Sequence, residues 1–506
     1  MPASMTLRAC ALAAAILAAG CGGGGGGSTA TPPVVVPPVV VPPVVTEPAT
    51  TLAFAEASVH DPAVIKTGDT YYVFGSHLAA AKTTDLMNWT KVADGVDNSN
   101  PLFTNVTSAL AEAFAWSQVT DLWAADVIQL EDGKFYFYYN TCKGDSPRSA
   151  MGLAVADKIE GPYVNKGVFL KSGMWGEASP DGAIYDARIH PNAVDPNTFR
   201  DKDGKLWMIY GSYSGGIFIL EMDKATGMPL PGQGYGKHLM GGNHSRIEGA
   251  YVMYSPQADY YYMFTSFGGL DANGAYNMRV ARSKNPNGPY VDAKGTDMAS
   301  VKANPTLPLF DDASIAPHGQ KLFGNHQFST GAGDAGVVSG YVSAGHNSAR
   351  YEAATQQHFL FFHTRFPGRG EQHEIRVHEM FVNEDGWPVV APLRYAPLSK
   401  SAVSLTPEVT AADAAGTYQF INHGKDISAT IKTAQSVRLE AGGVVSGAVT
   451  GTWSHRGRNK VQLVLAGGTF NGVLSRQFNA NAKRFVVTFT AQGQDGVSVW
   501  GVRTGA

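Results

Sequence analysis

The stretch "LEDGKFYFYYN" (Leu130–Asn140) pairs an Asp-Gly turn with a strongly aromatic segment, a combination typical of a β-hairpin. The same unit recurs along the chain: an extended segment, a polar turn, then an aromatic strand. The five aromatic strands are "YYVFGS" (Tyr71–Ser76), "FYFYYN" (Phe135–Asn140), "LWMIYGS" (Leu206–Ser212), "YYYMFTS" (Tyr260–Ser266) and "HFLFFHT" (His358–Thr364). Repetition of an antiparallel unit every several tens of residues predicts an all-β fold, a β-propeller of five blades.

We assign residues 52–397 to this propeller, which would be the catalytic domain. The last interval between repeats is longer than the others, so we expect an insertion between about Asp292 and Ser339. A β-sandwich is the structural alternative, but it does not explain the polar residues that precede each hairpin.

Residues 398–506 lack the repeated unit. Stretches such as "SVRLEAGGVVSGAVTGTWSH" alternate apolar and polar residues between glycine turns. This pattern predicts a small antiparallel β-barrel or sandwich. We expect it to support the propeller. Trp453 and Trp500 are candidates for polysaccharide contacts, with core packing at least as probable.

The first 51 residues are read as targeting and spacer segments. Residues 1–20 carry Arg8 and the apolar run "ALAAAILAAG" before Cys21, which resembles a bacterial lipoprotein signal with Cys21 as the lipidated residue. Cleavage of an ordinary secretory signal, leaving Cys21 a free thiol, is the alternative. Residues 21–51 are rich in glycine, proline and valine, as a tether should be. We expect a lipid-anchored protein of the cell envelope, at the outer membrane or cell surface, or a secreted one if Cys21 is not lipidated.

The charge of the chain limits its partners. Lys and Arg number 39 against 42 Asp and Glu, for a net charge of -3 over 506 residues. This balance gives no reason to expect nucleic acid or anionic lipid as a partner. We therefore expect no membrane contact beyond the lipid at Cys21. We also expect a monomer.

Five ionisable residues stand at the same place in the repeat, at the entrance of the strand before each aromatic strand. They are Asp61, Asp126, Asp195, Glu248 and His346. The innermost strands of a propeller line its central channel, so these residues should converge at one mouth. A single acid at a strand end is more often a turn or cap residue, and we give Asp126 that role, orienting groups inside blade two. The coincidence of position favours function for the other four.

Three carboxylates in one funnel suit hydrolysis of a glycosidic bond. One acid protonates the leaving oxygen while another carboxylate activates water or attacks the sugar. Like charges held close raise the pKa of one carboxyl, which keeps it protonated for the acid role.

The motifs "VHDPAVIKTGDTYYVFGS", "LWAADVIQLEDGKFYFYYN", "IHPNAVDPNTFRDKDGKLWMIYGSYSGGIF", "SRIEGAYV" and "GYVSAGHNSARY" resemble glycoside hydrolase family 43. The chain is most similar to its larger endo-α-1,5-L-arabinanases with an added C-terminal β domain. This resemblance implies inverting endo-hydrolysis of α-1,5-L-arabinan. Asp61 then matches the general base, Glu248 the general acid, and Asp195 the carboxylate that tunes the acid. His346 matches the residue holding one central cation, taken as calcium, whose other ligands are mostly water.

The resemblance also implies a sugar subsite next to the scissile bond, in addition to Asp61 and Asp195. Its residues are Asn192, Ala193, Val194, Ser212, Tyr213 and Arg246. Trp123 and Phe267 are our own candidates for stacking platforms, with core packing equally open. The chain departs from the family at Ala125 and Ala344, where proline is usual, and at Ser214, where smaller members often have tryptophan.

Two alternatives remain open at the level of sequence. The chain resembles exo-acting α-L-arabinofuranosidases and β-xylosidases of the same family as well, because loops rather than motifs separate these activities. A surface lipoprotein that binds glycans without cutting them is the non-enzymatic alternative, and the complete set of Asp61, Asp195 and Glu248 argues against it.

Overall fold

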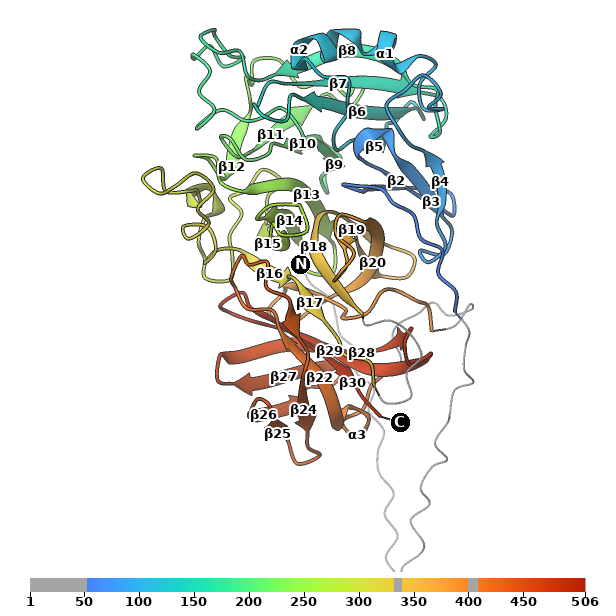
Figure 1. Cartoon of the computed structure of the whole chain (residues 1–506), viewed down its shortest axis with the longest axis vertical. Coiled ribbons are helices and arrows are strands. Elements are labelled where there is room, and N and C mark those ends of the chain that lie inside the picture. The colour runs from blue at the N-terminus through green and yellow to red at the C-terminus, as the bar shows by residue number, and fades with distance from the viewer. Residues whose placement is uncertain (1–51, 332–338, 399–407, 506) are drawn as a thin grey trace, which may run out of the picture. The chain divides into compact units, whose positions relative to one another are not determined.

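Five antiparallel sheets follow one another along the chain in the computed structural model, which describes residues 52–331, 339–398 and 408–505. Each sheet is built mainly from four strands consecutive in sequence, and the five sheets form the blades of a propeller (Figure 1). The predicted five-bladed propeller is therefore confirmed. The signal peptide and tether predicted for residues 1–51 lie outside the described residues.

The blades are made as follows. Blade one contains β1 (Ala63–Thr67), β2 (Thr70–Phe74), β3 (Ala80–Thr83) and β4 (Thr90–Ala93). Blade two contains β5 (Asp126–Gln129), β6 (Phe135–Cys142), β7 (Ser149–Ala156) and β8 (Val164–Lys171). Blade three contains β9 (Asn197–Arg200), β10 (Leu206–Tyr210), β11 (Ile217–Met222) and β12 (Lys237–Met240). Blade four contains β13 (Ile247–Ser255), β14 (Tyr260–Phe267), β15 (Asn277–Ser283) and β16 (Gln320–Phe323). Blade five contains β18 (Gly340–Glu352), β19 (Gln357–Arg365), β20 (His373–Val382) and β21 (Pro388–Val390), extended by β17 (His326–Gln327) and β23 (Lys432–Thr433).

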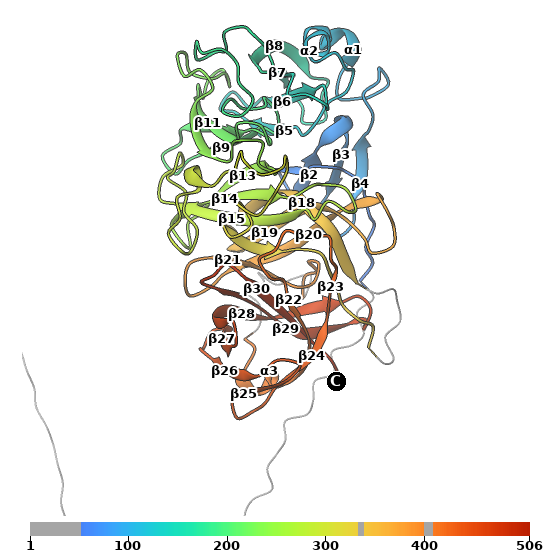
Figure 2. The same ribbon diagram turned by 60° about the vertical axis from the view of Figure 1, so that its left-hand side comes forward.

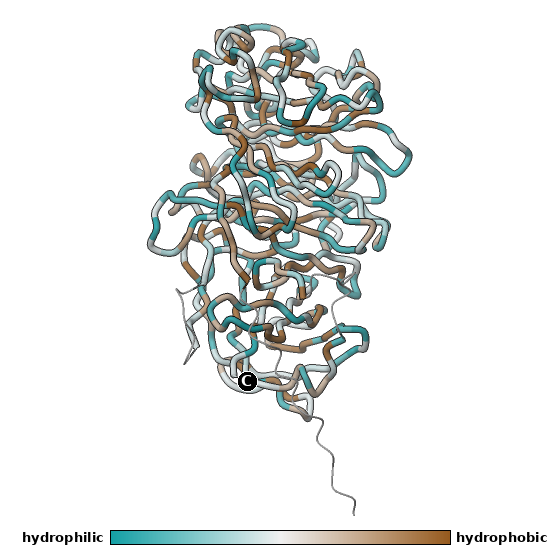
Figure 3. The backbone as a smooth tube through the Cα atoms, turned by 90° about the vertical axis from the view of Figure 1, so that its right-hand side faces the viewer, coloured by the Kyte–Doolittle hydropathy of each residue, from teal (hydrophilic) through white to brown (hydrophobic). Residues whose placement is uncertain are grey.

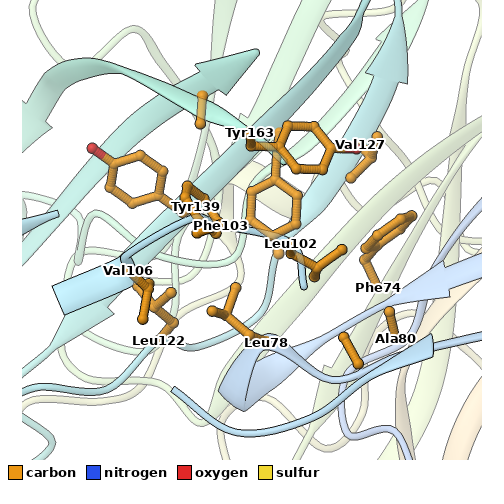
Figure 4. Close-up of a cluster of buried hydrophobic side chains, with 14 of the residues drawn as sticks. Phe74, Leu78, Ala80, Leu102, Phe103, Val106, Leu122, Val127, Tyr139 and Tyr163 are labelled. Carbon is orange, nitrogen blue, oxygen red and sulfur yellow. The ribbon is translucent and has the colours of Figure 1, made fainter. Parts of the chain in front are cut away.

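The aromatic strands of the sequence are the second strands of the blades. Every residue of β6 is buried, because its sheet packs against neighbouring blades on both faces. Between blades one and two, the ring of Phe137 lies 5.9 Å from those of Phe74 and Phe103 in edge-to-face contact, in a cluster that also holds Val127 and Tyr163 (Figure 4). Figure 3 shows the apolar residues concentrated along the strands and the polar ones in the loops.

Helices are few and short. Two stand between blades one and two, α1 (Val106–Ala109) and α2 (Ala111–Ser117), and η1 (Ser76–Leu78) follows β2. The long interval expected between about Asp292 and Ser339 contains most of the β15–β16 connection, then β16 and β17. That connection spans residues 284–319, includes η2 (Met298–Ser300), and is drawn in yellow-green in Figure 1. Among the described residues, no helix has both the length and the apolar character needed to cross a membrane.

The C-terminal segment forms a closed antiparallel barrel of eight strands (Figure 2), as the sequence predicted. After α3 (Ala411–Ala414), the strands are β22 (Gly416–Asn422), β24 (Gln435–Leu439), β25 (Val444–Gly447), β26 (Gly451–His455), β27 (Lys460–Leu465), β28 (Gly468–Asn479), β29 (Arg484–Gly493) and β30 (Ser498–Arg503). Trp453 and Trp500 are both buried, so each is a packing residue.

The barrel and blades four and five share one core. The ring of Trp500 lies 5.0 Å from that of Phe323 and 5.1 Å from that of His326. Lys321 is buried at this boundary, and its ammonium donates to the carbonyls of His423 and Asp426 at 3.0 and 2.7 Å. Carbonyl oxygens thus replace the water that a buried cation loses.

We expect acid to destabilise this shared core. Burial lowers the pKa of His326 to about 4 and that of His378 to about 3, whereas an unfolded histidine has a pKa of about 6.5. Between pH 6.5 and 4 the unfolded chain binds more protons than the folded chain. The free energy of unfolding should therefore fall by about 1.4 kcal/mol for each histidine with every unit by which the pH is lowered. Above pH 6.5 these groups contribute no slope. Denaturant titrations at pH 7.5, 6 and 5 measure this. His378→Phe should reduce the slope, and an unchanged slope would contradict the assignment.

Candidate active site

The structure brings together Asp61, Asp195, Glu248 and His346, four of the five residues predicted to converge. The Nδ1 atom of His346 lies 3.0 Å from Oδ1 of Asp61. The amide of Gly249, next to Glu248, donates to Oδ2 of Asp195 at 3.4 Å. All three carboxylates are at most 8% exposed. Residues up to 285 positions apart in sequence therefore meet because the blades close into a ring.

Left-handed backbone at the strand entrances positions these side chains. Asp61, Asp195 and His346 have φ of 56°, 58° and 43°. Asp and His are among the non-glycine residues enriched in this region, and each such residue still costs about 1–3 kcal/mol. In blade four Gly249 takes this conformation, with φ of 60°, inside a β-bulge of β13. A Cβ on Gly249 would lie 2.9 Å from Cγ of His346, so glycine there leaves room for the imidazole.

Asp61 is held by groups on every side. Ser76 Oγ donates to its Oδ2 at 2.5 Å, and Nδ1 of His60 lies 2.8 Å from the same oxygen. Its own amide donates to Nδ1 of His363 at 3.1 Å. Burial raises the pKa of Asp61, but the imidazoles of His346 and His60 outweigh it and hold that pKa well below its ordinary value. Asp61 is therefore an ionised carboxylate, as a general base must be.

The pKa of Glu248 is shifted in the opposite direction from that of Asp61. Burial raises its pKa above the ordinary value, and two hydroxyl donors only partly oppose this. These are Ser212 Oγ, 2.7 Å from Oε2, and Tyr276 Oη, 2.9 Å from Oε1. A carboxyl with a raised pKa keeps its proton to a higher pH than an ordinary glutamate, which suits a general acid.

The pKa of Asp195 is also raised, like that of Glu248. Burial raises the pKa of Asp195 to about 7, and the nearby charge of Glu248 adds to the effect. The hydrogen bond that Asp195 accepts from the Gly249 amide is long, at 3.4 Å. Two interacting carboxyls titrate as a pair, so protonation of Asp195 and of Glu248 are linked.

His346 supplies the positive charge of the site. Burial opposes its protonation, yet the carboxylates of Asp61 and Asp195 raise its pKa to about 9. Beside it, Asn347 is 1% exposed, and neither amide atom of its side chain has a hydrogen-bond partner among the described residues. The carboxylate oxygens gathered at His346, of which Oδ1 of Asp61 is 3.0 Å from Nδ1, are ligands that suit a hard cation. These residues therefore fit the cation expected at His346, once the imidazole gives up its proton.

Asp126 is structural, but its partner differs from the one expected. Its Oδ2 accepts from the amide and from Oγ1 of Thr198, at 2.7 and 2.5 Å. Thr198 belongs to β9, so Asp126 joins blade two to blade three rather than orienting groups within blade two.

The residues predicted for the sugar subsite form two groups. Ala193 and Val194 are fully buried, and the Ala193 amide donates to Ser172 Oγ at 3.0 Å. Asn192 is nearly buried, with Oδ1 accepting from Ser149 Oγ at 2.5 Å. These three support the loop before Asp195, and their contact with a sugar stays a prediction.

The second group lies closer to Glu248. Ser212 donates to it, and the adjacent Tyr213 donates from Oη to the carbonyl of Gly268 at 3.3 Å. Arg246 forms a bidentate pair with Asp312 of the β15–β16 connection, with Nε 3.1 Å from Oδ1.

The two candidate stacking platforms differ in exposure. Trp123 is partly exposed. Phe267 is fully buried in the core of blades three and four, with the Arg279 guanidinium 4.6 Å from its ring centroid. The prediction of Phe267 as a sugar platform was wrong, because the end of this central strand faces the core.

Sequence reasoning missed several supporting residues, namely Ser76, Tyr276, His60, His363 and Asp312. One signal was available for the serines. Three aromatic strands run into serine, and each serine bonds to the site: Ser76 to Asp61, Ser212 to Glu248, and Ser266 to the amide of His346 at 2.7 Å. No sequence pattern distinguishes the remaining missed residues, Tyr276, His60, His363 and Asp312, from residues without a role in the site.

Comparison with known proteins agrees with this architecture. Residues 52–313 match the family described as glycosyl hydrolases family 43, and residues 392–501 match its C-terminal lipocalin-like domain. An extracellular endo-α-(1→5)-L-arabinanase of Bacillus subtilis (strain 168) is 58% identical, over 88% of this chain and 93% of its own. The extracellular endo-α-(1→5)-L-arabinanase of Thermotoga petrophila is 49% identical, over 89% and 94%. The crystal structure of a family 43 glycoside hydrolase from Bacillus licheniformis has a TM-score of 0.86 at 58% identity, covering 90% of this chain and 100% of that one.

Removing the Tyr276 hydroxyl should raise the pKa of Glu248. The hydroxyl stabilises the ionised carboxylate, so Tyr276→Phe should shift this pKa further upward. Titration of ¹³C-labelled glutamate carboxyls by NMR measures it, with the Glu248 signal assigned from Glu248→Gln. Tyr262→Phe is the matched control, because Tyr262 is a buried tyrosine of the same blade that donates to the Gly386 carbonyl. A Glu248 pKa that stays constant in Tyr276→Phe contradicts the role given to this hydroxyl.

Proposed function

The chain belongs to glycosyl hydrolase family 43, and from this premise we propose that it hydrolyses α-(1→5)-L-arabinan at internal linkages. One observation carries the proposal: a buried ionised carboxylate, Asp61, shares the site with Glu248, a buried carboxyl whose pKa is raised. Hydrolysis of a glycosidic bond requires this division between base and acid.

The roles follow from the environments. Asp61 accepts a proton from the attacking water, and the hydrogen bond from Ser76 and the imidazole of His60 keep its carboxylate oriented. Glu248 donates its proton to the departing glycosidic oxygen. Asp195 lies close enough to Glu248 for the two to titrate together, so it sets the pH at which Glu248 is protonated. Direct attack by water on the anomeric carbon inverts its configuration.

Endo action is supported by the relatives that align over nearly the whole chain, since both are named endo-α-(1→5)-L-arabinanases. An exo-acting α-L-arabinofuranosidase or β-xylosidase would need the same carboxylates, so those residues do not separate the activities. A glycan-binding lipoprotein without catalysis would have no use for two carboxyls with opposed pKa shifts.

We also propose a single calcium ion at His346, with water as most of its other ligands. The support is the fit of the residues: Nδ1 of His346 lies 3.0 Å from Oδ1 of Asp61, and the charges of Asp195 and Glu248 also act on the imidazole. When bound, such a cation supplies fixed positive charge that offsets the carboxylates. The protein's own part is to hold His346 through the bond from its amide to Ser266 Oγ.

We propose in addition that Cys21 carries a lipid and that residues 21–51 tether a monomeric enzyme to the cell envelope. The relatives named above are called extracellular, which supports export. The glycine and proline-valine composition of the segment after Cys21 supports a spacer.

Product analysis on linear arabinan tests the main proposal. We expect a mixture of arabino-oligosaccharides early in the reaction, and ¹H NMR of the fresh products should show an anomer inverted relative to the substrate. Release of arabinose alone would mean exo action. Retention of configuration would contradict the assignment of Asp61 as base, and no release at all would leave glycan binding.

Glu248→Ala should abolish hydrolysis of arabinan, with a loss of at least about 10²–10⁴-fold, the usual contribution of general acid catalysis. Aryl α-L-arabinofuranosides should lose much less, because their leaving groups need little protonation. The matched control is Glu379→Ala. Burial likewise raises the pKa of Glu379, to about 7, but that residue lies on β20 and bonds with Gln357. An equal loss on both substrates in Glu248→Ala would contradict the acid role.

A further inference from the structure

The β15–β16 connection carries an exposed apolar group beside the active site. Within residues 304–316, here called the arm, Leu307, Leu309 and Phe310 are 39%, 66% and 46% exposed. Single exposed apolar residues are normal on a protein surface, but three within four positions form a patch that calls for a ligand or partner.

The arm is fixed to the rim of the catalytic centre. Arg246, two residues before Glu248, holds Asp312 through two parallel hydrogen bonds, the geometry that gives guanidinium–carboxylate pairs their directionality. Both side chains are largely buried, at 23% and 13% exposed. At the base of the arm, the amide of Ala303 donates to Ser245 Oγ at 2.7 Å, and Asn243 Nδ2 donates to the Ala303 carbonyl at 3.0 Å.

Phe310 is the arm residue that reaches the site. Its ring centroid lies 5.6 Å from that of Tyr213, in edge-to-face contact, and Tyr213 is adjacent to Ser212, the donor to Glu248. Phe310 also has φ of 67°, which is an outlier for a bulky residue. Strained backbone of this kind collects at ligand-binding sites, where the surrounding structure holds it in place.

We propose that Phe310, which packs on Tyr213 at the edge of the subsite next to the scissile bond, forms the aromatic wall of a second sugar subsite, which binds the next arabinofuranosyl unit of the chain. The inference rests on the proposed function and deepens it. The C–H faces of a sugar ring pack on aromatic rings, and the Arg246–Asp312 pair presents this ring without a loop-ordering cost at the moment of binding. In this arrangement the arm makes binding depend on the length of the substrate.

The test compares substrates of different length. We expect Phe310→Ala to raise KM for arabinohexaose. The ratio of kcat/KM for arabinohexaose to kcat/KM for an aryl α-L-arabinofuranoside should fall by about tenfold. The basis is loss of a partly buried aromatic contact. Phe310→Tyr should keep the wild-type ratio, because it keeps the ring. Leu309→Ala is the matched control: the neighbour is more exposed than Phe310 and lacks the contact with Tyr213, so its ratio should stay within about twofold of the wild type.

The outcomes separate this inference from the proposed function. Wild-type protein that fails to cleave arabinohexaose would overturn the proposed function itself. Cleavage by the wild type with an unchanged substrate ratio in Phe310→Ala would overturn the second subsite alone. An equal loss on both substrates would also overturn it, as would a Leu309→Ala variant that reproduces the effect. Thermal melting of each variant shows whether a loss of activity is caused by unfolding. If Phe310→Ala is unfolded, calorimetry measures the affinity for arabinohexaose in the inactive Glu248→Gln variant, with and without Phe310→Tyr. Because Phe310→Tyr keeps an aromatic ring, a weaker Kd in the double variant would count against stacking.

Discussion

Burial of like charge around one imidazole is the constraint on which the rest of the site depends. Asp61, Asp195 and Glu248 are each at most 8% exposed, and charges removed from water are costly unless paired. His346 and His60 keep Asp61 ionised, whereas burial raises the pKa of both Asp195 and Glu248. The same ring of charge therefore contains one carboxylate with a lowered pKa, which suits a base, and one carboxyl with a raised pKa, which suits an acid. Their difference comes from which carboxylate contacts the imidazoles.

The propeller builds this difference with one repeated device. Left-handed backbone occurs at the strand entrance, at Asp61 in blade one, at His346 in blade five and at Gly249 next to Glu248 in blade four. A serine from an aromatic strand then bonds to the entrance residue: Ser76 to Asp61 of its own blade, Ser212 of blade three to Glu248 of blade four, and Ser266 of blade four to the amide of His346 of blade five. Backbone strain and hydrogen bonds are thus arranged by the repeat. Blade two departs from this arrangement, because its entrance residue, Asp126, accepts hydrogen bonds from Thr198 instead.

This explains which features were predictable from the sequence. The aromatic strands and the entrance residues recur, so the blade number and the convergence of Asp61, Asp195, Glu248 and His346 followed from repetition. Tyr276 and Asp312 belong to connections that differ in every blade, and no periodicity marks them. Phe267 was wrongly proposed as a stacking platform for a sugar. An aromatic residue at the end of a buried strand has the same local sequence whether its ring faces a channel or a core. Only the packing of Arg279 over that ring decides between them.

The C-terminal barrel contributes to the site through the blades on which it packs. Ile421 and Trp500 of the barrel share a core with Phe323 of blade four and Phe362 of blade five. Blade four carries Glu248 and blade five carries His346, so the barrel covers the outer part of the two sheets that present the acid and the imidazole. Neutral buried histidines and a lysine satisfied by carbonyls fill this boundary. This boundary is that of a single folded unit. Removing the barrel would expose an apolar face and leave Lys321 without its carbonyl partners. These groups lie on blades four and five, which position Glu248 and His346.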